Sequence, residues 1–468
     1  MDFYSLLNGA WRIRSAKEEL TAGDVREKVD YFSSNLVADA INKNVDFGEI
    51  FVFVIRNNIE GMLSYFIASR LKVHAMLLNI KDINNLPCVI NVQHVAAVIH
   101  FSADVSASTE QLIHIRLNEV ISKSPQPDTV SVPVSREGLA EAFFYFTTSG
   151  TTSVPKLVRY HESSLVGNAE CVSQYLGLTP EDNTICFFPV QYMYGLSTML
   201  TVFISKGVLV FEHFQLGLVP ELIEKYSITT MPLIGDLMIP LSKVLQGKSC
   251  RIKRILNASD RLLASQAISI LPYCETLWNN FGQTESGPRL FCVKITSSKD
   301  IRTYSRYGVI PPGFPMIPEI KTEIRSTEAE SEYGELYYHT PFAADGYVSK
   351  DFVLTPQSYW QKSGDLFAID HQDCHHWYSR VVNEFKVKGK FVPIQIISDQ
   401  IMSLAGTRHY FNRDKSGVIN LNIESSVKNE ELNKIKLLLS NNWHQYSFNV
   451  NVIPQFDLTP SGKIKTVQ

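Results

Sequence analysis

The sequence has few of the features that mark secreted, membrane-spanning or nucleic-acid-binding proteins. Its seven cysteines are scattered, odd in number and without a C-x-x-C pair, which favours reduced thiols in a cytoplasm over a disulfide scaffold. No uninterrupted apolar run approaches the roughly 20 residues of a membrane helix. The N-terminus lacks the basic leader and apolar core of a signal peptide. We therefore expect a soluble cytoplasmic protein with no membrane partner.

Neither the net charge nor the repeat content of the sequence indicates a special class of protein. The formal net charge of −3 gives no electrostatic reason to expect nucleic acid as a partner. No internal repeat or low-complexity tract is present. With 468 residues, 45% of them hydrophobic and 19% charged, the chain has a globular composition. Its length indicates about two to four structural units.

Strand-like and helix-like segments alternate along much of the chain. The runs FVFVIRNN, HAMLLNI and VAAVIHFS read as short buried strands, and a helical EGMLSYFIASRLKV follows the first. The same alternation recurs after residue 160, so we predict mainly parallel sheets with crossover helices. From about residue 319 the pattern changes to antiparallel strands and turns. The last ninety residues read as a small α+β unit.

One stretch, FFYFTTSGTTSVPKLVRY at residues 143–160, has an unusual composition for its position. Six Ser or Thr residues, one Gly, one Pro and a Lys stand between two apolar segments. Hydroxyls and backbone N–H groups around a glycine suit a phosphate, and the lysine adds charge. The spacing is not that of G-x-x-x-x-G-K-[ST], and no G-x-G-x-x-G follows a strand. The stretch is therefore predicted to be a phosphate loop of another kind.

The segment YFTTSGTTSVPK resembles the phosphate loop of the adenylate-forming superfamily, which contains acyl- and aryl-CoA synthetases, nonribosomal adenylation domains and luciferase. Further segments resemble the superfamily's motifs in their usual order. They are NNFGQTES, GFPMIP, GELYYHTPFAADGY, WQKSGDLF, SRVVNEFKVKG and LTPSGKIK. The resemblance runs from about residue 45 to residue 468, and the set of motifs is highly specific.

The resemblance implies an α/β fold with two domains. Residues 1–378 are expected to form a large N-terminal domain that binds ATP and the acid. It would contain mainly parallel sheets with crossover helices and a small β-barrel-like part. Residues 379–468 are expected to form a small mobile α+β lid domain.

The resemblance also implies an ATP and Mg²⁺ site. The superfamily first joins a carboxylate to the α-phosphate of ATP, and no general base is needed because a carboxylic acid with a pKa near 4 is already ionised. Charge neutralisation and alignment are needed instead. The residues expected to line the β- and γ-phosphates are Thr148, Ser149, Gly150, Thr151, Thr152 and Lys156. Glu285 is expected to hold Mg²⁺ as a hard carboxylate ligand.

The remaining nucleotide contacts come from the other motifs. Phe281 is expected to stack on adenine, with Gly282 and Thr284 beside it. Asp365 suits both ribose hydroxyls because an ionised carboxylate only accepts hydrogen bonds. Arg380 is expected to contact ribose or phosphate, and Lys463 to bridge the carboxylate and α-phosphate oxygens.

A second reaction would transfer the acyl group to a thiol, either coenzyme A or the phosphopantetheine of a carrier protein. Gly389 matches the glycine that borders the pantetheine tunnel. In the superfamily the C-terminal domain rotates about an Asp between the two reactions. This chain has Val382 at that position, followed by Asn383, and Ser379 replaces a Gly. A hinge nevertheless needs only to absorb a backbone rotation.

The acid pocket is expected to begin at PVQYMYG. The residues assigned to it are Tyr192, Met193, Tyr194, Gly195, Ser259 and Asn280. Enzymes that activate α-amino acids place an Asp where this chain has Met193, so an ammonium group would lack its counter-ion. The segment is closer to those of coumarate- and dihydroxybenzoate-activating enzymes, although the latter place an Asn at that position. An aryl or short unsaturated acid is therefore predicted, in a pocket with an apolar, aromatic wall.

Three alternatives remain open at this stage. One is a stand-alone amino-acid adenylation enzyme. Another is a non-catalytic protein that binds an acyl-adenylate, which the departures at Ser153, Ser379 and Val382 would suit. The third is a luciferase-like oxygenase, which light emission or oxygen uptake would distinguish.

Lys463→Ala is expected to abolish adenylate formation and leave folding intact, because the side chain is predicted to lie in a mobile loop. The measurement is ATP–pyrophosphate exchange with the best acid. Exchange within about tenfold of the unsubstituted protein (~1.4 kcal/mol) would remove Lys463 from the site.

Overall fold

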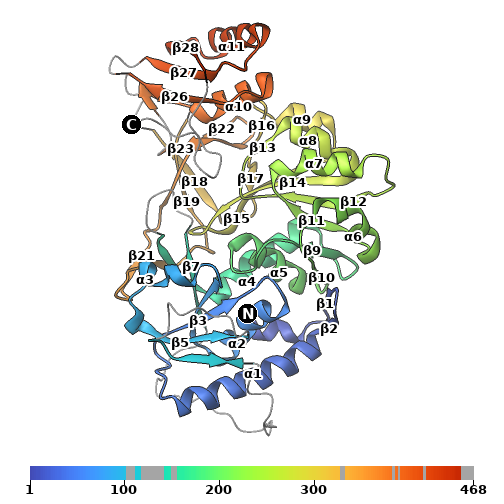
Figure 1. Ribbon diagram of the computed structural model, residues 1–468, viewed down its shortest axis with the longest axis vertical. Coiled ribbons are helices and arrows are strands. Elements are labelled where there is room, and N and C mark those ends of the chain that lie inside the picture. The colour runs from blue at the N-terminus through green and yellow to red at the C-terminus, as the bar shows by residue number, and fades with distance from the viewer. Residues whose placement is uncertain are drawn as a thin grey trace.

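The computed structural model describes residues 1–101, 111–117, 142–148, 155–326, 333–381, 385–387, 390–414 and 418–454. Two large sheets and the helices around them occupy most of its length, and a smaller C-terminal unit lies at one end of the long axis (Figure 1). No helix within these ranges is long and apolar enough to cross a membrane. The seven cysteines are all unpaired.

The first large sheet has eight strands and contains most of the N-terminal chain. In spatial order they are β21 (Leu354–Pro356), β20 (Gly346–Val348), β8 (Leu157–His161), β7 (Phe143–Thr147), β4 (His74–Asn79), β3 (Ile50–Ile55), β5 (Val95–His100) and β6 (His114–Arg116). The strands from β7 to β6 pair in parallel, and β8, β20 and β21 extend the sheet antiparallel. Every residue of β3 is buried, as expected for a strand covered on both faces.

The second large sheet has nine strands. In spatial order they are β17 (Phe314–Pro315), β15 (Gly287–Ile295), β14 (Cys274–Gln283), β12 (Ile252–Asn257), β11 (Thr230–Leu233), β9 (Asn183–Cys186), β10 (Val208–Phe211), β1 (Arg12–Ser15) and β2 (Glu19–Thr21). The strands from β14 to β1 pair in parallel. The predicted parallel sheets with crossover helices are thus confirmed.

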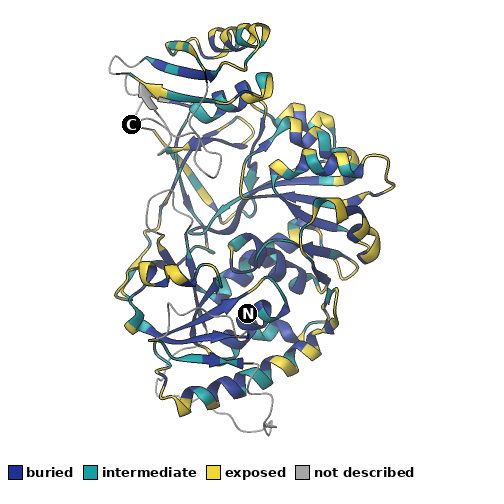
Figure 2. Cartoon of the chain, in the orientation of Figure 1, coloured by how far each residue is buried: buried dark blue, intermediate teal, exposed yellow. Residues whose placement is uncertain are grey.

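Helices fill the space between the two sheets. The four that share a core with strands of both sheets are α1 (Ala22–Asn42), α2 (Ile59–Leu71), α4 (Glu162–Leu176) and α5 (Met193–Ser205). Figure 2 shows α4 and α5 largely buried, whereas one face of α1 is exposed. A second core lies on the other face of the nine-stranded sheet. The helices that carry it or join the strands around it are α6 (Val219–Tyr226), α7 (Gly235–Leu245), α8 (Ala264–Ile270) and α9 (Ser298–Tyr304), and a short α3 (Leu86–Val89) lies against the eight-stranded sheet.

An antiparallel sheet follows in the chain, where the change of pattern predicted one. Its strands are β18 (Lys321–Arg325), β19 (Gly334–His339), β22 (Gln361–Ile369) and β23 (His375–Arg380). This is the part predicted to be barrel-like, and its strand order runs from β18 to β23 without closing. Two short strand pairs complete the set: β13 (Leu262–Leu263) with β16 (Val309–Ile310), and β24 (Phe385–Val387) with β25 (Lys390–Val392).

The C-terminal unit is a small α+β structure. It contains α10 (Ile394–Ala405), α11 (Asn429–Asn442) and a sheet of β26 (His409–Arg413), β27 (Ile419–Glu424) and β28 (Phe448–Ile453). Its core also includes Leu366, Ala368 and Tyr378 from β22 and β23. The unit therefore packs on the four-stranded sheet, and the domain boundary predicted at residue 379 lies inside β23.

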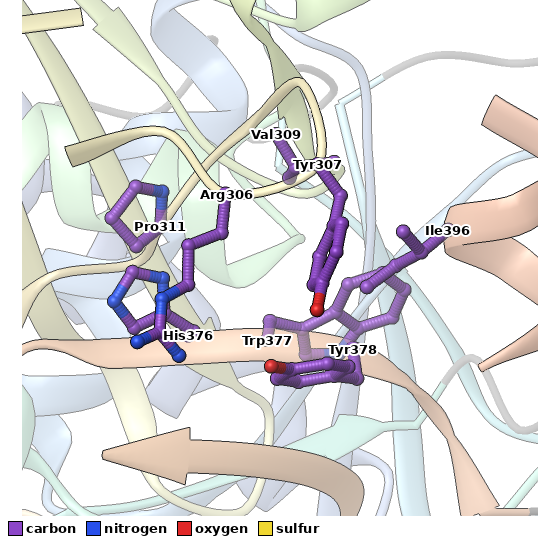
Figure 3. Close-up of a pocket in the computed structure, with 8 residues that line it drawn as sticks. All are labelled: Arg306, Tyr307, Val309, Pro311, His376, Trp377, Tyr378 and Ile396. Carbon is purple, nitrogen blue, oxygen red and sulfur yellow. The ribbon is translucent and has the colours of Figure 1, made fainter. Parts of the chain in front are cut away.

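A small pocket of about 10 Å³ marks this junction. Its lining consists of Arg306, Tyr307, Val309, Pro311, His376, Trp377, Tyr378 and Ile396 (Figure 3). Tyr307 also packs on Trp443 at 4.9 Å between ring centroids, and Arg261 forms a hydrogen bond of 2.5 Å with the α10 residue Asp399. A space of this volume holds at most about one water molecule, so the junction is packed closely and offers no room for a substrate.

A buried carboxylate ties the N-terminus to the central helices. Glu162 at the start of α4 accepts hydrogen bonds from the Phe3 N–H at 3.0 Å, the Ala142 N–H at 2.9 Å and the Ser69 hydroxyl at 2.6 Å. Its side chain is fully buried, and burial raises its pKa while these three donors lower it. The three donors come from separate parts of the chain, so Glu162 determines how they meet.

Glu162→Ala is expected to lower the free energy of unfolding by roughly 3 kcal/mol or more, because three buried donors lose their acceptor. Urea unfolding measures this quantity. Glu27→Ala, at an exposed position of α1, is the matched control and should change stability by less than about 0.5 kcal/mol. Equal stability of the two variants would show that Glu162 does not hold these segments together.

Candidate functional site

The predicted phosphate loop connects two paired strands of the eight-stranded sheet. Thr147 at the end of β7 lies opposite Leu157 at the start of β8, and the Thr148 N–H donates to the Lys156 carbonyl at 2.8 Å. These contacts close the base of the loop and bring the backbones of Thr148 and Lys156 together, and their role in holding phosphates stays a prediction. The other four residues assigned to the loop lie outside the described residues: Ser149, Gly150, Thr151 and Thr152.

Lys156 and Glu285 lie on either side of one tyrosine. The Lys156 ammonium is 5.0 Å from the centre of the Tyr347 ring. The Tyr347 hydroxyl donates to Glu285 Oε1 at 3.0 Å. Burial raises the pKa of Tyr347, and the charge of Glu285 raises it further, so the phenol stays protonated and remains a donor. A cation and an anion from different sheets are therefore positioned beside each other.

The carboxylate of Glu285 has one oxygen left for a ligand. Tyr347 occupies Oε1, and Oε2 accepts no hydrogen bond from the residues that the structure describes. The backbone carbonyl of Glu285 accepts a hydrogen bond from the Ala344 N–H at 3.0 Å, and the carbonyl of the neighbouring Thr284 accepts one from the Tyr160 hydroxyl at 2.7 Å. A hard carboxylate oxygen beside the phosphate loop fits the requirements of Mg²⁺.

A cavity of about 260 Å³ lies beside these residues. Its lining consists of Cys88, Val89, Pro155, Lys156, Leu157, Tyr347, Val348, Ser349, Lys350 and Thr355. Two lysines contribute to it, so it is cationic where it adjoins the phosphate loop. This location fits an anionic ligand.

Gly282 is required by a close backbone contact. A Cβ atom at this position would lie 2.2 Å from the Pro288 carbonyl oxygen. At the same point the register of β14 and β15 shifts, because Phe281 pairs with Phe291 whereas Gln283 pairs with Gly287. The extra residues of β15 form a bulge opposite Gly282, and such bulges re-aim side chains beside functional sites.

Phe281 belongs to an aromatic cluster just before this bulge. Its ring stacks on Phe291 at 5.8 Å and meets the edge of Phe367 at 5.2 Å. It is half-buried, which leaves part of the ring accessible. Its role in stacking on adenine stays a prediction.

Asp365 is fully buried and already has protein partners. Its Oδ1 accepts from Trp377 Nε1 at 3.0 Å and pairs with Arg380 Nε at 2.9 Å, and its Oδ2 accepts from Gln283 Nε2 at 2.5 Å. Burial raises the pKa of Asp365 to about 6, although Arg380, Trp377 and Gln283 lower it. A carboxylate oxygen accepts more than one hydrogen bond, so acceptor capacity remains.

A second cluster of potential metal ligands lies in the hairpin between β22 and β23. Side-chain atoms of Asp370, Cys374 and His376 lie within 4.8 Å of one another. His376 Nε2 is already 3.0 Å from Asp370 Oδ2, and burial lowers the pKa of His376 with a smaller contribution from the positive charge of Arg306. A neighbouring cation disfavours a metal ion, so we regard this cluster as a hydrogen-bonded part of the hairpin.

The residues assigned to the acid pocket separate in the structure. Tyr192 is 49% exposed, and its hydroxyl donates to Asp82 at 3.2 Å. Tyr194 is buried, and its hydroxyl donates to the Leu256 carbonyl at 2.7 Å. Met193 lies between them and is half-buried. Of the two tyrosines, only Tyr194 faces the interior between α5 and the nine-stranded sheet.

Three further residues were assigned to the acid pocket, and the structure shows the local surroundings of each. A Cβ atom at Gly195 would lie 2.3 Å from the Pro189 carbonyl oxygen, so this glycine lets α5 begin where it does. Ser259 is exposed with a φ of +74°. Asn280 donates to the Asn257 carbonyl at 2.9 Å and accepts from the Tyr175 hydroxyl at 2.5 Å. The Asn280 side chain thus supports the strands β12 and β14.

The structure brings four further residues into the site region to which the sequence motifs had given no role: Gln283, Tyr347, Trp377 and Arg289. The first two lie inside the motifs FGQTES and GELYYHTPFAADGY, so their positions were a usable signal. Trp377 carried no signal, since its contact with Asp365 depends on the pairing of β22 and β23. Arg289 adds a cation beside one residue of the predicted apolar pocket wall, because its guanidinium lies over the ring of Tyr194 at 4.6 Å.

The roles predicted for the residues of the C-terminal motifs stay predictions. Ser379 is buried and its hydroxyl donates to the Arg380 carbonyl at 3.2 Å. The outer side of Arg380 remains exposed. Val382, Asn383, Gly389 and Lys463 lie outside the described residues.

Known proteins resemble this chain in sequence. The family model for the AMP-binding enzyme matches residues 13–348. A protein of Humulus lupulus named as a probable CoA ligase is 24% identical over 326 residues, which cover 65% of this chain and 55% of that protein. A 2-succinylbenzoate–CoA ligase of Staphylococcus aureus is 24% identical over 267 residues, covering 56% of this chain and 51% of that one. The chain thus spans about half the length of the curated relatives it matches.

Solved structures resemble it over nearly its whole length. The O-succinylbenzoate coenzyme A synthetase of Bacillus subtilis, in complex with AMP, has a TM-score of 0.78 at 17% identity and covers 99% of this chain and 97% of its own. The amide bond synthetase of Marinactinospora thermotolerans has a TM-score of 0.73 at 15% identity, with 98% and 97% covered. These likenesses show the fold. Since the family model spans most of the sequence, the chain belongs to the AMP-binding enzyme family.

Proposed function

We propose that this protein is an AMP-forming ligase that joins a carboxylic acid to a thiol. The observation that carries the proposal is the meeting of Lys156, Glu285 and Asp365, which come from three different sheets. Tyr347 connects the first two, and Gln283 connects the β14–β15 turn to the third. A cation for phosphates, a hard carboxylate for Mg²⁺ and an acceptor for ribose hydroxyls are the groups that ATP needs.

In the first reaction, a carboxylate oxygen of the acid attacks the α-phosphorus of ATP. The bond from that phosphorus to the bridging oxygen breaks, and pyrophosphate leaves. Lys156 and the hydroxyls of residues 148–152 would hold the β- and γ-phosphates, Asp365 the ribose, and Arg380 the ribose or a phosphate. Glu285 would hold Mg²⁺, which supplies charge neutralisation. Lys463 would align the two reacting groups, and no proton has to be removed.

In the second reaction, a thiol attacks the acyl-adenylate carbonyl, a thioester forms and AMP leaves. Coenzyme A is the proposed acceptor, and a carrier-protein phosphopantetheine is the alternative. The names of the relatives support coenzyme A, because they are called CoA ligases. Residues 379–468 would act as the mobile domain, with Gly389 beside the thiol. The close junction with β22 and β23 would be one of its two positions.

The proposed acid is an aryl or short unsaturated carboxylic acid. Tyr194 and the half-buried Met193 lie at the start of α5, and Met193 carries no charge that would pair with an ammonium. The relatives named for 2-succinylbenzoate and the solved anthranilate CoA ligase act on aryl acids by their names. Those names support the choice of class.

ATP–pyrophosphate exchange across a panel of acids tests the function. Benzoate or cinnamate should exceed phenylalanine by about a thousandfold, since an unpaired buried ammonium costs on the order of 4 kcal/mol. Met193→Asp should reduce this preference by supplying a counter-ion, and Met193→Asn is the uncharged control.

Three outcomes would contradict the proposed function and indicate another one. A better exchange with phenylalanine would indicate an amino-acid adenylation enzyme. Adenylate binding without any exchange would indicate a non-catalytic binding protein. Oxygen uptake or light emission with an adenylate would indicate the oxygenase.

Asp365 provides a test of nucleotide binding that does not depend on the acid. Its carboxyl group accepts hydrogen bonds from ribose hydroxyls more strongly when it is ionised, and its pKa is raised to about 6 by burial. Adenosine should therefore bind more tightly as the pH rises from 5 to 7.5, and it has no phosphate that titrates in this range. Calorimetry would measure the affinity, with 2′,3′-dideoxyadenosine as the ligand control and Asp365→Asn as the protein control. If all three titrations share one pH dependence, Asp365 does not bind ribose.

A further inference from the structure

A buried arginine between α5 and β15 has no acidic partner. Arg289 is 1% exposed, and neither its Nε nor its Nη1 has a hydrogen-bond partner in the described residues. No carboxylate of those residues forms an ion pair with it. A guanidinium stays charged at any physiological pH and carries five N–H donors. The protein therefore keeps an incompletely satisfied cation inside its central layer.

The bulge in β15 determines the position of this side chain. Pro288, Arg289 and Leu290 lie between the paired residues Gly287 and Phe291, and Gly282 alone stands opposite them. The backbone of Arg289 is held there, since its carbonyl accepts from Asn168 Nδ2 on α4 at 2.8 Å. A regular strand would place the side chain by simple alternation, whereas the bulge re-aims it.

The guanidinium of Arg289 has two tyrosine neighbours. Tyr194 was predicted to line the acid pocket, and Tyr175 contacts Asn280, which was also predicted to line it. Arg289 Cζ lies 4.6 Å from the centre of the Tyr194 ring. Burial raises the pKa of Tyr194 to about 12, and the charge of Arg289 opposes this rise. The same charge acts on Tyr175, whose hydroxyl donates to Asn280 Oδ1 at 2.5 Å. Arg289 thus contacts Tyr194, which was predicted to line the acid pocket, and lies near Tyr175, whose hydroxyl contacts another such residue, Asn280.

Contact with an aromatic ring does not replace the missing acceptors. A cation over a ring face gains some electrostatic attraction, but the N–H groups in the plane of the guanidinium still need oxygen atoms. Burial of a cation without such partners is strongly unfavourable. An anionic group of a ligand would give one of these two nitrogens an acceptor, and a carboxylate matches the fork that either of them forms with Nη2.

We propose that Arg289 selects acids that carry a second anionic group, so that the substrate class is a dicarboxylic acid of aryl or short unsaturated type. One carboxylate is activated by ATP, and the other pairs with the guanidinium. This inference rests on the proposed ligase function and makes it more specific. Arg289 is then a specificity-determining residue, because it contacts the part of the substrate that does not react.

The experiment compares matched acids in ATP–pyrophosphate exchange. One pair is fumarate and crotonate, and the other set is the three benzenedicarboxylates and benzoate. In the unsubstituted protein at least one diacid should exceed its monoacid in kcat/KM by about tenfold or more, the effect of a hydrogen bond to a charged group. Arg289→Met should lower that ratio by a similar factor, and Arg289→Lys should retain part of it.

The outcomes separate this inference from the function on which it rests. Exchange with monoacids and no preference for any diacid would overturn the role of Arg289 and leave the ligase intact. An equal loss with every acid in Arg289→Met, or a higher KM for ATP alone, would assign Arg289 to folding or to a phosphate and would also overturn it. Absence of exchange with all acids would contradict the ligase itself. If Arg289→Met does not fold, the diacid ratio of the unsubstituted protein and of Arg289→Lys still decides the question.

Discussion

The approach of one backbone segment to Gly282 is the constraint on which the site depends. A Cβ atom at residue 282 would lie only 2.2 Å from the Pro288 carbonyl oxygen, so a residue other than glycine would clash there. This contact lets β15 bulge as it turns back from β14. Glu285 lies in the turn between the two strands, Phe281 and Gln283 lie near the end of β14, and Arg289 lies in β15. Four side chains of different chemistry are thus oriented by the absence of one methyl group.

The polar groups around this turn add hydrogen bonds between three sheets that also share apolar cores. Tyr347 of the eight-stranded sheet donates a hydrogen bond to Glu285, and Gln283 of the nine-stranded sheet donates one to Asp365 of the four-stranded sheet. Trp377 donates to Asp365 and also lines the pocket at the C-terminal junction (Figure 3). A movement of the C-terminal unit that displaces Trp377 would therefore change the partners of Asp365. Asp365, which we propose binds ribose, thus shares Trp377 with the lining of the C-terminal junction.

The charged residues discussed above lie in two environments: Lys156 and Glu285 are accessible to water, and Arg289 is buried. Lys156 is exposed and Glu285 is half-buried, so water can stabilise their charges. Arg289 lies in the central layer, where water is excluded and a charge without acceptors is costly. A substrate with two anionic ends would complement both regions. The uncharged Met193 and the cationic Arg289 both disfavour an acid that carries an ammonium.

The sequence by itself determined the parallel sheets, the change to antiparallel strands and the location of the segment predicted to be a phosphate loop. These depend on contiguous residues: β3 and β4 have unbroken apolar runs, and the loop has its hydroxyls, Gly150 and Lys156 within ten residues. The family motifs further predicted Glu285 and Asp365 as site residues, and the structure brings both to one region. Only the tertiary structure decided that Gln283 and Trp377 hold Asp365, since these contacts join separate strands. It also decided that Arg289 is buried, because a bulge breaks the alternation from which the direction of a strand residue is inferred.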